Sequence, residues 1–144
     1  MADLTPDQVR LYIRDHVDYN RLIDEQEFTD ERIVFARDLT LDMFNVLPPL
    51  TFYSLAEFPN RYILLMGTLH NLYLGEAAMA ARNQMSYSDG GLSIPIEERF
   101  EYYNNLAAQY GTQFSQLAQQ FKIHKNIEDG WGEVGSDFAR FPSF

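Results

Sequence analysis

Two pairs of carboxylates, Asp38 with Asp42 and Glu97 with Glu101, stand four residues apart in segments with helical periodicity. On a helix this spacing places both side chains on one face, where they could hold a divalent metal ion. No histidine stands at a matching offset to complete either site. A solvated acidic face is therefore the better interpretation of both pairs.

The histidines His16, His70 and His124 fall in three different predicted elements, without an H-E-x-x-H arrangement or a readable pairing of nucleophile and base. His70 lies in an apolar segment and is expected to be a satisfied interior residue. The Asp89-Gly90-Gly91 turn lacks the known glycine patterns that cradle phosphates. With no cysteine in the chain, thiolate chemistry is excluded as well. We expect no enzyme, no cofactor and no metal site.

Composition indicates one globular domain, because the chain has 144 residues of which 46% are hydrophobic and 15% aromatic. The formal net charge is −10, and residues 1–45 hold 11 of the 21 acidic residues with five of the 11 basic ones. Such a surface argues against binding nucleic acid or an anionic membrane. The most apolar stretch, Tyr62 to Gly75, is shorter than the roughly 20 residues that span a bilayer. No signal peptide is recognisable and cysteine is absent, which favours a soluble cytoplasmic product without a membrane partner.

Three helices are expected before residue 90. Thr5-Pro6-Asp7-Gln8 begins the first, which should end near His16, and Thr29 caps a second that should end near Asn45 before two prolines. Arg61 to Met85 predicts a long third helix, central in the fold because its first half is apolar nearly all round. Small residues along it, namely Gly67, Gly75 and the alanines at 77, 78, 80 and 81, should permit close approach of neighbouring helices. The second helix should bury a stripe of Ile33, Ala36, Thr40, Met43, Phe44 and Leu47.

A fourth helix begins at Ile96, where the apolar spacing alternates between four and three residues. Its aromatic-rich seam suits packing onto a broad helical core better than a free coiled coil. The seam residues are Ile96, Phe100, Tyr103, Ala107, Tyr110, Phe114, Leu117 and Phe121. The sequence thus predicts a mainly α protein, a small bundle of three to four helices over residues 1–121.

Residues 122–144 are predicted to form an extended tail that docks on a partner. The alternation from Lys122 to Ile127 resembles a short strand, and the glycine-rich remainder loses much backbone entropy on ordering. Large apolar rings on such a segment should order only where another surface receives them, unless they fold back on the chain's own helices. The predicted partner-binding residues are Ile123, Ile127, Trp131, Phe138, Phe141 and Phe144.

The order of elements resembles the head-to-tail connector proteins of tailed bacteriophages, also called adaptor or neck proteins. The resemblance extends from about Leu11 to Gly132 and contains no catalytic signature. The stretches that carry it are Leu11-Tyr12-Ile13-Arg14-Asp15, Asn20-Arg21-Leu22-Ile23-Asp24, Glu27-Phe28-Thr29-Asp30-Glu31, Phe58-Pro59-Asn60-Arg61-Tyr62-Ile63-Leu64-Leu65-Met66-Gly67, Ala81-Arg82-Asn83-Gln84-Met85-Ser86-Tyr87-Ser88-Asp89-Gly90-Gly91 and Ile127-Glu128-Asp129-Gly130-Trp131-Gly132.

This resemblance implies a structural virion protein, made in the host cytoplasm, that forms a ring of about twelve copies between the portal protein and the tail or a second neck protein. DNA would pass through the ring without specific binding, and the C-terminal tail would reach into the portal. The segment from Ser86 to Ile94 would lie at a neighbouring subunit or the tail side. Its inter-subunit residues would be Tyr87, Asp89, Gly90 and Gly91.

The alternative hypothesis is a small acidic inhibitor that mimics DNA in a basic groove of another protein. Its carboxylates would then be the binding residues. Arginines interleave with the acidic residues of the first third, which dilutes a phosphate-like array and favours the connector. They are Arg10, Arg14, Arg21, Arg32 and Arg37.

Overall fold

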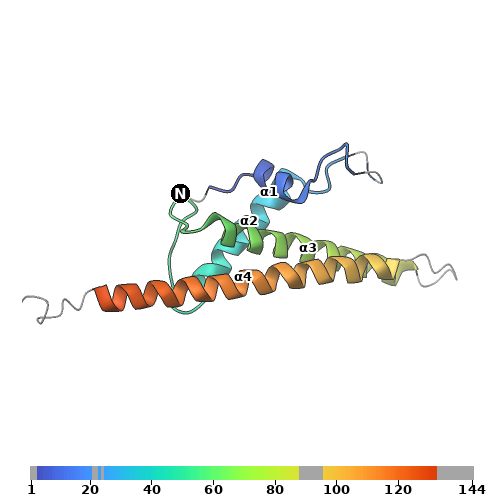
Figure 1. The fold of residues 1–144 in the computed structure, drawn as a ribbon. Coiled ribbons are helices and arrows are strands. Elements are labelled where there is room, and N and C mark those ends of the chain that lie inside the picture. Colours follow the sequence, from blue (N-terminus) through green and yellow to red (C-terminus); the bar gives the residue numbers. More distant parts are fainter. Residues whose placement is uncertain (1–2, 21–22, 24, 88–95, 133–144) are drawn as a thin grey trace, which may run out of the picture.

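The computed structural model describes residues 3–20, 23, 25–87 and 96–132, and these contain four helices (Figure 1). The helices are α1 (Pro6–Ile13), α2 (Asp30–Val46), α3 (Arg61–Tyr87) and α4 (Ile96–Gly132). α3 packs against both α2 and α4, and α1 contacts α2. The predicted mainly α bundle is confirmed.

Both predicted N-terminal caps are present. The Thr5 hydroxyl accepts a hydrogen bond from the Gln8 backbone N–H, and the Gln8 side chain accepts one from the Thr5 N–H, which makes a capping box. Thr29 caps α2 through the Arg32 N–H. α1 ends at Ile13, three residues before the expected end, because Arg14 takes a left-handed conformation with a φ of 56°.

The two longest helices form an antiparallel hairpin, which Figure 1 shows running the length of the molecule. All seven residues from Ile63 to Leu69 on α3 are buried, so the prediction of a central third helix is confirmed. At about 1.5 Å per residue, α3 is about 40 Å long and α4 about 55 Å. α4 therefore extends past the start of α3 at one end of the molecule (Figure 1).

Three helices meet at Gly67. A Cβ atom there would lie 2.2 Å from Thr40 Cγ2 on α2 and 2.9 Å from Phe114 Cδ2 on α4. The absence of a Cβ at Gly67 permits this close approach, in line with the prediction that small residues on this helix let its neighbours come near. The same prediction is wrong for Gly75, where a Cβ would meet no atom within 4 Å because that face of α3 is exposed.

The apolar seam of α4 faces the core. Ala107 and Phe114 are buried, and Tyr103, Tyr110, Leu117 and Phe121 pack partly buried against the same cluster. Phe100 is half-buried, whereas the side chain of Ile96 lies outside the described residues. The interpretation of the seam as core is confirmed.

The buried stripe of α2 is confirmed at four of six positions, namely Ile33, Ala36, Thr40 and Phe44. Leu47 is half-buried. Met43 was predicted to be buried, but it is 37% exposed because it lies at the edge of the contact with α3, next to an open groove between α2 and α4.

The strand predicted at Lys122 to Ile127 is wrong, because α4 continues as a helix to Gly132. The two isoleucines satisfy a helical spacing of four as well as the period of two that suggested a strand. An ion pair between Lys125 and Asp129 at 3.0 Å, four residues apart, supports the helix, and His124 Nε2 lies 3.1 Å from Glu128 Oε1 at the same spacing. Of the predicted extended tail, residues 122–132 are therefore helical.

Candidate partner-binding surfaces

The distal end of α4 (residues 123–130) projects from the bundle, and all eight of its residues are exposed. Ile123 and Ile127 lie one turn apart on it and are 60% and 52% exposed. An exposed apolar pair on a helix that its own chain does not cover is a typical feature of a surface that binds another molecule. The structure thus places both isoleucines on a helical arm.

Lys122 anchors the root of this arm. Its side chain is 2% exposed, and its Nζ donates hydrogen bonds to the carbonyl oxygens of Leu47 and Pro49, the latter at 2.9 Å. The same Nζ lies 4.7 Å from the centroid of the Phe44 ring. Burial lowers the pKa of the Lys122 ammonium. α4 is thereby joined to the C-cap of α2, Leu47, and to the loop that follows it.

The Phe52 loop (residues 47–53) follows α2 and exposes Leu50 and Phe52, the latter 93% exposed. Asn45 fixes this loop from within α2. Its Oδ1 accepts hydrogen bonds from Thr51 Oγ1 and the Tyr53 N–H, and its Nδ2 donates to the Tyr53 carbonyl oxygen, each at 3.0 Å. Phe52 is therefore an aromatic side chain held in solvent by a hydrogen-bonded loop.

An apolar groove of about 490 Å³ lies between α1 and the first turns of α3. Leu4 and Leu65 are buried at its floor, and Leu11, Tyr12 and Tyr62 are exposed along its walls. Two polar side chains complete this α1–α3 groove, namely Gln8 and Arg61. The groove has the chemistry of a site for an apolar or aromatic side chain.

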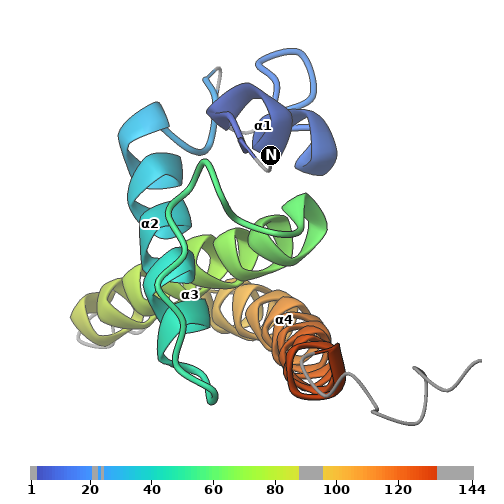
Figure 2. The same ribbon diagram turned by 90° about the vertical axis from the view of Figure 1, so that its left-hand side faces the viewer.

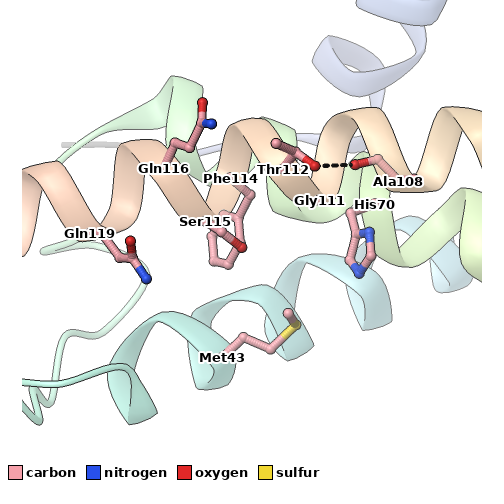
Figure 3. Close-up of a pocket in the computed structure, with 9 residues that line it drawn as sticks. All are labelled: Met43, His70, Ala108, Gly111, Thr112, Phe114, Ser115, Gln116 and Gln119. Carbon is pink, nitrogen blue, oxygen red and sulfur yellow. Dashed lines mark hydrogen bonds between the residues drawn. The ribbon is translucent and has the colours of Figure 1, made fainter.

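A second groove, of about 420 Å³, lies between α2 and α4 (Figure 3). Its α4 wall consists of small or polar residues together with Phe114, and His70 and Met43 enter it from α3 and α2. His70 Nδ1 lies 2.7 Å from the Ala107 carbonyl oxygen, and a Cβ on Gly111 would lie 2.6 Å from the same nitrogen. His70 thus helps join α3 to α4, as expected of an interior histidine with a hydrogen-bond partner.

The N-terminal segment is attached to the bundle by polar side chains that we call the N-terminal clamp. Asp15, buried, accepts hydrogen bonds from the backbone N–H groups of Glu27 at 2.7 Å and Phe28 at 3.0 Å. Arg10, also buried, donates to the Phe28 carbonyl oxygen and pairs with Asp7 and Asp30. The carboxylates of Asp7, Asp15 and Asp30 therefore help to hold the N-terminal segment on the bundle.

Two further acidic residues link the long helices to earlier parts of the chain, Glu27 before α2 and Glu76 through Arg32 on α2. Tyr103 on α4 donates a hydrogen bond of 2.8 Å to Glu27 Oε1, and the buried Glu76 on α3 forms an ion pair with Arg32. Burial raises the pKa of Glu27, and the hydrogen bond from Tyr103 opposes that shift. Burial also raises the pKa of Tyr103. Some carboxylates of the first third, such as Asp15 and Glu27, therefore make contacts inside the protein.

The predicted partner-binding residues are only partly described. Ile123 and Ile127 lie on the distal end of α4, and Trp131 lies on the same helix, although its side chain is outside the described residues. Tyr87 is the last residue of α3. The positions outside the described residues are Asp89, Gly90, Gly91, Phe138, Phe141 and Phe144.

Sequence reasoning missed the Phe52 loop and the α1–α3 groove. A signal existed for the loop, since Leu50 and Phe52 stand in a short segment between Pro48-Pro49 and Pro59, where no helix or strand could bury them. For the groove there was none, because it forms only when α1 lies against the start of α3.

Comparisons of the chain with protein-family models, characterised proteins and solved structures found no match. No helix in the described part of the chain is long and apolar enough to cross a membrane. Among the same residues, no cluster of three histidine or carboxylate side chains could hold a metal ion.

Proposed function

We propose that this protein is a head-to-tail connector of a tailed bacteriophage, a non-enzymatic subunit of a ring between the portal and the tail. The observation that carries the proposal is the distal end of α4, a projecting helix with eight consecutive exposed residues and an apolar pair, Ile123 and Ile127. A ring subunit needs such an arm to reach a neighbouring protein. The resemblance in the sequence supplies the identity of that neighbour.

In this proposal the arm and the residues after it contact the portal protein. Trp131, Phe138, Phe141 and Phe144 supply aromatic anchors of the kind that dominate interface energetics. The residues near Tyr87, Asp89, Gly90 and Gly91 face an adjacent subunit, the tail or a second neck protein. The ring, of about twelve copies, belongs to the neck of the virion.

The net charge of −10 suits a conduit for DNA, because like charge repels phosphate and leaves the channel free of binding sites. It would also suit a protein that mimics DNA. Against the mimic, Asp15 and Glu76 are buried in internal contacts, and Asp7 and Asp30 pair with Arg10. The two buried carboxylates cannot contribute to a phosphate-like array, and Arg10 offsets the charge of the two exposed ones.

The proposal is tested by measuring the mass of the purified protein by native mass spectrometry, alone and mixed with portal rings. A connector joins the portal in a fixed complex of many copies. A protein that ignores portal rings and binds a nucleic-acid enzyme one to one would instead be a mimic.

The role of the arm is tested with the double variant Ile123→Asp/Ile127→Asp. We expect it to fold normally and to lose portal binding, since two charges replace the apolar pair. The matched control is Gln120→Asp/Asn126→Asp, which adds two carboxylates to exposed positions of the same helix. Equal loss of binding in both variants would show that added charge, rather than the isoleucine pair, disrupts the contact.

A further inference from the structure

One face of α4 joins the groove between α2 and α4 to the exposed isoleucine pair. Thr112, Gln116, Gln119, Ile123 and Ile127 follow one another at intervals of four, three, four and four residues, a spacing that keeps their side chains on one side of the helix. The first three line the groove, and the two isoleucines lie beyond it. The described residues leave all five side chains exposed. This α4 outer face is therefore one continuous surface that a single extended segment could follow.

The groove offers apolar contacts and hydrogen-bonding groups side by side (Figure 3). The buried Phe114 ring lies at its floor, and Met43 forms the wall on α2. Leu39 and Val46 stand about one turn to either side of Met43 and are also exposed. The glutamines of the α4 outer face carry amide groups, which can bond to the backbone of an extended chain. A segment that has aromatic side chains on an extended backbone has the matching chemistry.

Residues 133–144, which directly follow α4, carry such side chains. Phe138, Phe141 and Phe144 stand three residues apart, and Pro142 favours an extended backbone between the last two. Gly135 and Ser136 are residue types that favour a turn ahead of the first ring. Because this segment is attached to the end of the helix that carries the α4 outer face, its effective concentration there is about millimolar at any protein concentration.

The reach of this segment matches the length of the face. A reversal of the chain takes about four residues, which leaves residues 137–144 to span about 26 Å at roughly 3.3 Å per extended residue. The helix from Ser115 in the groove to the end of α4 is also about 26 Å long. Folded back along α4, Phe138 comes level with Ile127, and Phe144 comes level with Ser115.

We infer that residues 133–144 fold back on the α4 outer face of their own chain. Phe138 then covers the isoleucine pair, and Phe144 enters the groove between α2 and α4 beside Met43. The inference concerns the free chain and goes beyond the proposed function, on which it does not rest. Docking within one chain loses no translational freedom, so it needs less buried area than an interface between two molecules. On a portal the same rings would have to leave the face, so the face would act as their cover before assembly.

The chain contains no cysteine, so an introduced pair of thiols reports a single contact. The test variant is Ser115→Cys/Ser143→Cys, with one thiol in the groove and one in the segment. Its control is Gln113→Cys/Ser143→Cys, because Gln113 is exposed at nearly the same height of α4 but about 160° round the helix from Ser115. Under mild oxidation at low micromolar protein, the intramolecular disulfide should form about tenfold faster in the test variant. Adding Phe141→Ser/Phe144→Ser should abolish that difference.

Two outcomes of this experiment would overturn the inference. Equal rates in the test and control variants would mean that the segment does not prefer the α4 outer face. Disulfide-linked dimers in place of intramolecular bonds would mean that the face receives the segment of a second copy.

A second measurement leaves the chain without cysteine. In the methyl NMR spectrum of the full chain, Phe141→Ser/Phe144→Ser should move the Met43 resonance, because the ring currents of the docked aromatic rings are lost. Met79 on α3 is the matched control, since it is similarly exposed but does not line the groove, and its resonance should stay in place. An unmoved Met43 resonance would contradict the docking. Neither measurement involves a portal, so failure of portal binding and failure of this docking are separate results.

Discussion

The hairpin of α3 and α4 and the N-terminal segment before α2 share one apolar core but differ in how much they depend on buried polar groups. The hairpin buries a continuous apolar surface, with Met66, Leu69 and Phe114 almost fully enclosed. The N-terminal segment also buries Leu4, Val9 and Phe28, but it depends in addition on buried polar groups, chiefly Arg10 and Asp15, which bond to backbone atoms of residues 27 and 28. Apolar burial is non-directional, whereas a buried hydrogen bond fails when one partner is lost. The hairpin should therefore set global stability, and the N-terminal clamp should set local stability.

The largest effect should come from Phe114→Ala, in the hairpin. Phe114 is 2% exposed and its ring lies against Gly67, so truncation leaves a cavity at the junction of three helices. We expect a loss of about 3–5 kcal/mol in the free energy of unfolding, measured by urea denaturation. A loss below about 1 kcal/mol would mean that the seam of α4 opens in the free protein.

Two glycines on α3 give a paired test of the same hairpin. Gly67→Ala should cost about 1–3 kcal/mol, because its Cβ would overlap Thr40. Gly75→Ala should stabilise by up to about 1 kcal/mol, since its Cβ meets open space and alanine favours the helix. In thermal unfolding, the midpoint temperature should fall for Gly67→Ala and rise for Gly75→Ala relative to the wild type. A shift in the same direction would contradict the close approach at Gly67.

The N-terminal clamp should respond locally to Asp15→Asn. The amide retains one acceptor and presents a donor to a backbone N–H, so one buried contact becomes unsatisfied at a cost of about 1–2 kcal/mol. Hydrogen exchange should accelerate in α1 and residues 27–29 while α3 keeps its protection. Asp18→Asn, at an exposed position, is the control and should leave exchange unchanged. Faster exchange in α3 as well would show that the two regions unfold together.

The smallest effect concerns pH at Glu27, the acid whose pKa burial raises above its usual 4.5. The folded state then binds this proton more tightly than the unfolded state, so the contribution of Glu27 to stability falls as pH rises from about 4.5 through the folded pKa. Glu27→Gln keeps an acceptor for Tyr103 without the charge. At pH 7 it should be neutral or slightly stabilising, with the advantage vanishing toward pH 4.5. A variant that is less stable than wild type at pH 7 would contradict this sign.

Local chemistry explains which features could be predicted. Thr5, Thr29 and the proline pair after α2 fix helix ends through contacts within a few residues, so they were readable without the fold. The seam of α4 was likewise visible in its spacing. The end of that helix was not, because Ile123 and Ile127 fit a strand and a helix equally well and the ion pairs that favour the helix are weak.

The candidate surfaces also include residues that the sequence predicted and residues that it did not. Ile123 and Ile127 were expected to contact a partner, and their exposure on α4 is consistent with that expectation. Lys122, expected at the start of a tail, instead lies buried over Phe44 and fixes the Phe52 loop. The burial of Lys122 could not be predicted from the local sequence, because its partners are backbone carbonyls more than 70 residues away.

By itself the sequence determined the helical class, the caps, the central place of α3 and the inward face of α4, because each depends on periodicity or on contacts between near neighbours. The tertiary structure alone decided that neighbouring helices close on Gly67 and leave Gly75 open, that Asp15 and Lys122 are buried, and that the Phe52 loop and the α1–α3 groove lie on different sides. Those properties arise where segments distant in the chain meet. Packing and burial depend on these long-range contacts, and the spacing of residues along the chain does not predict them.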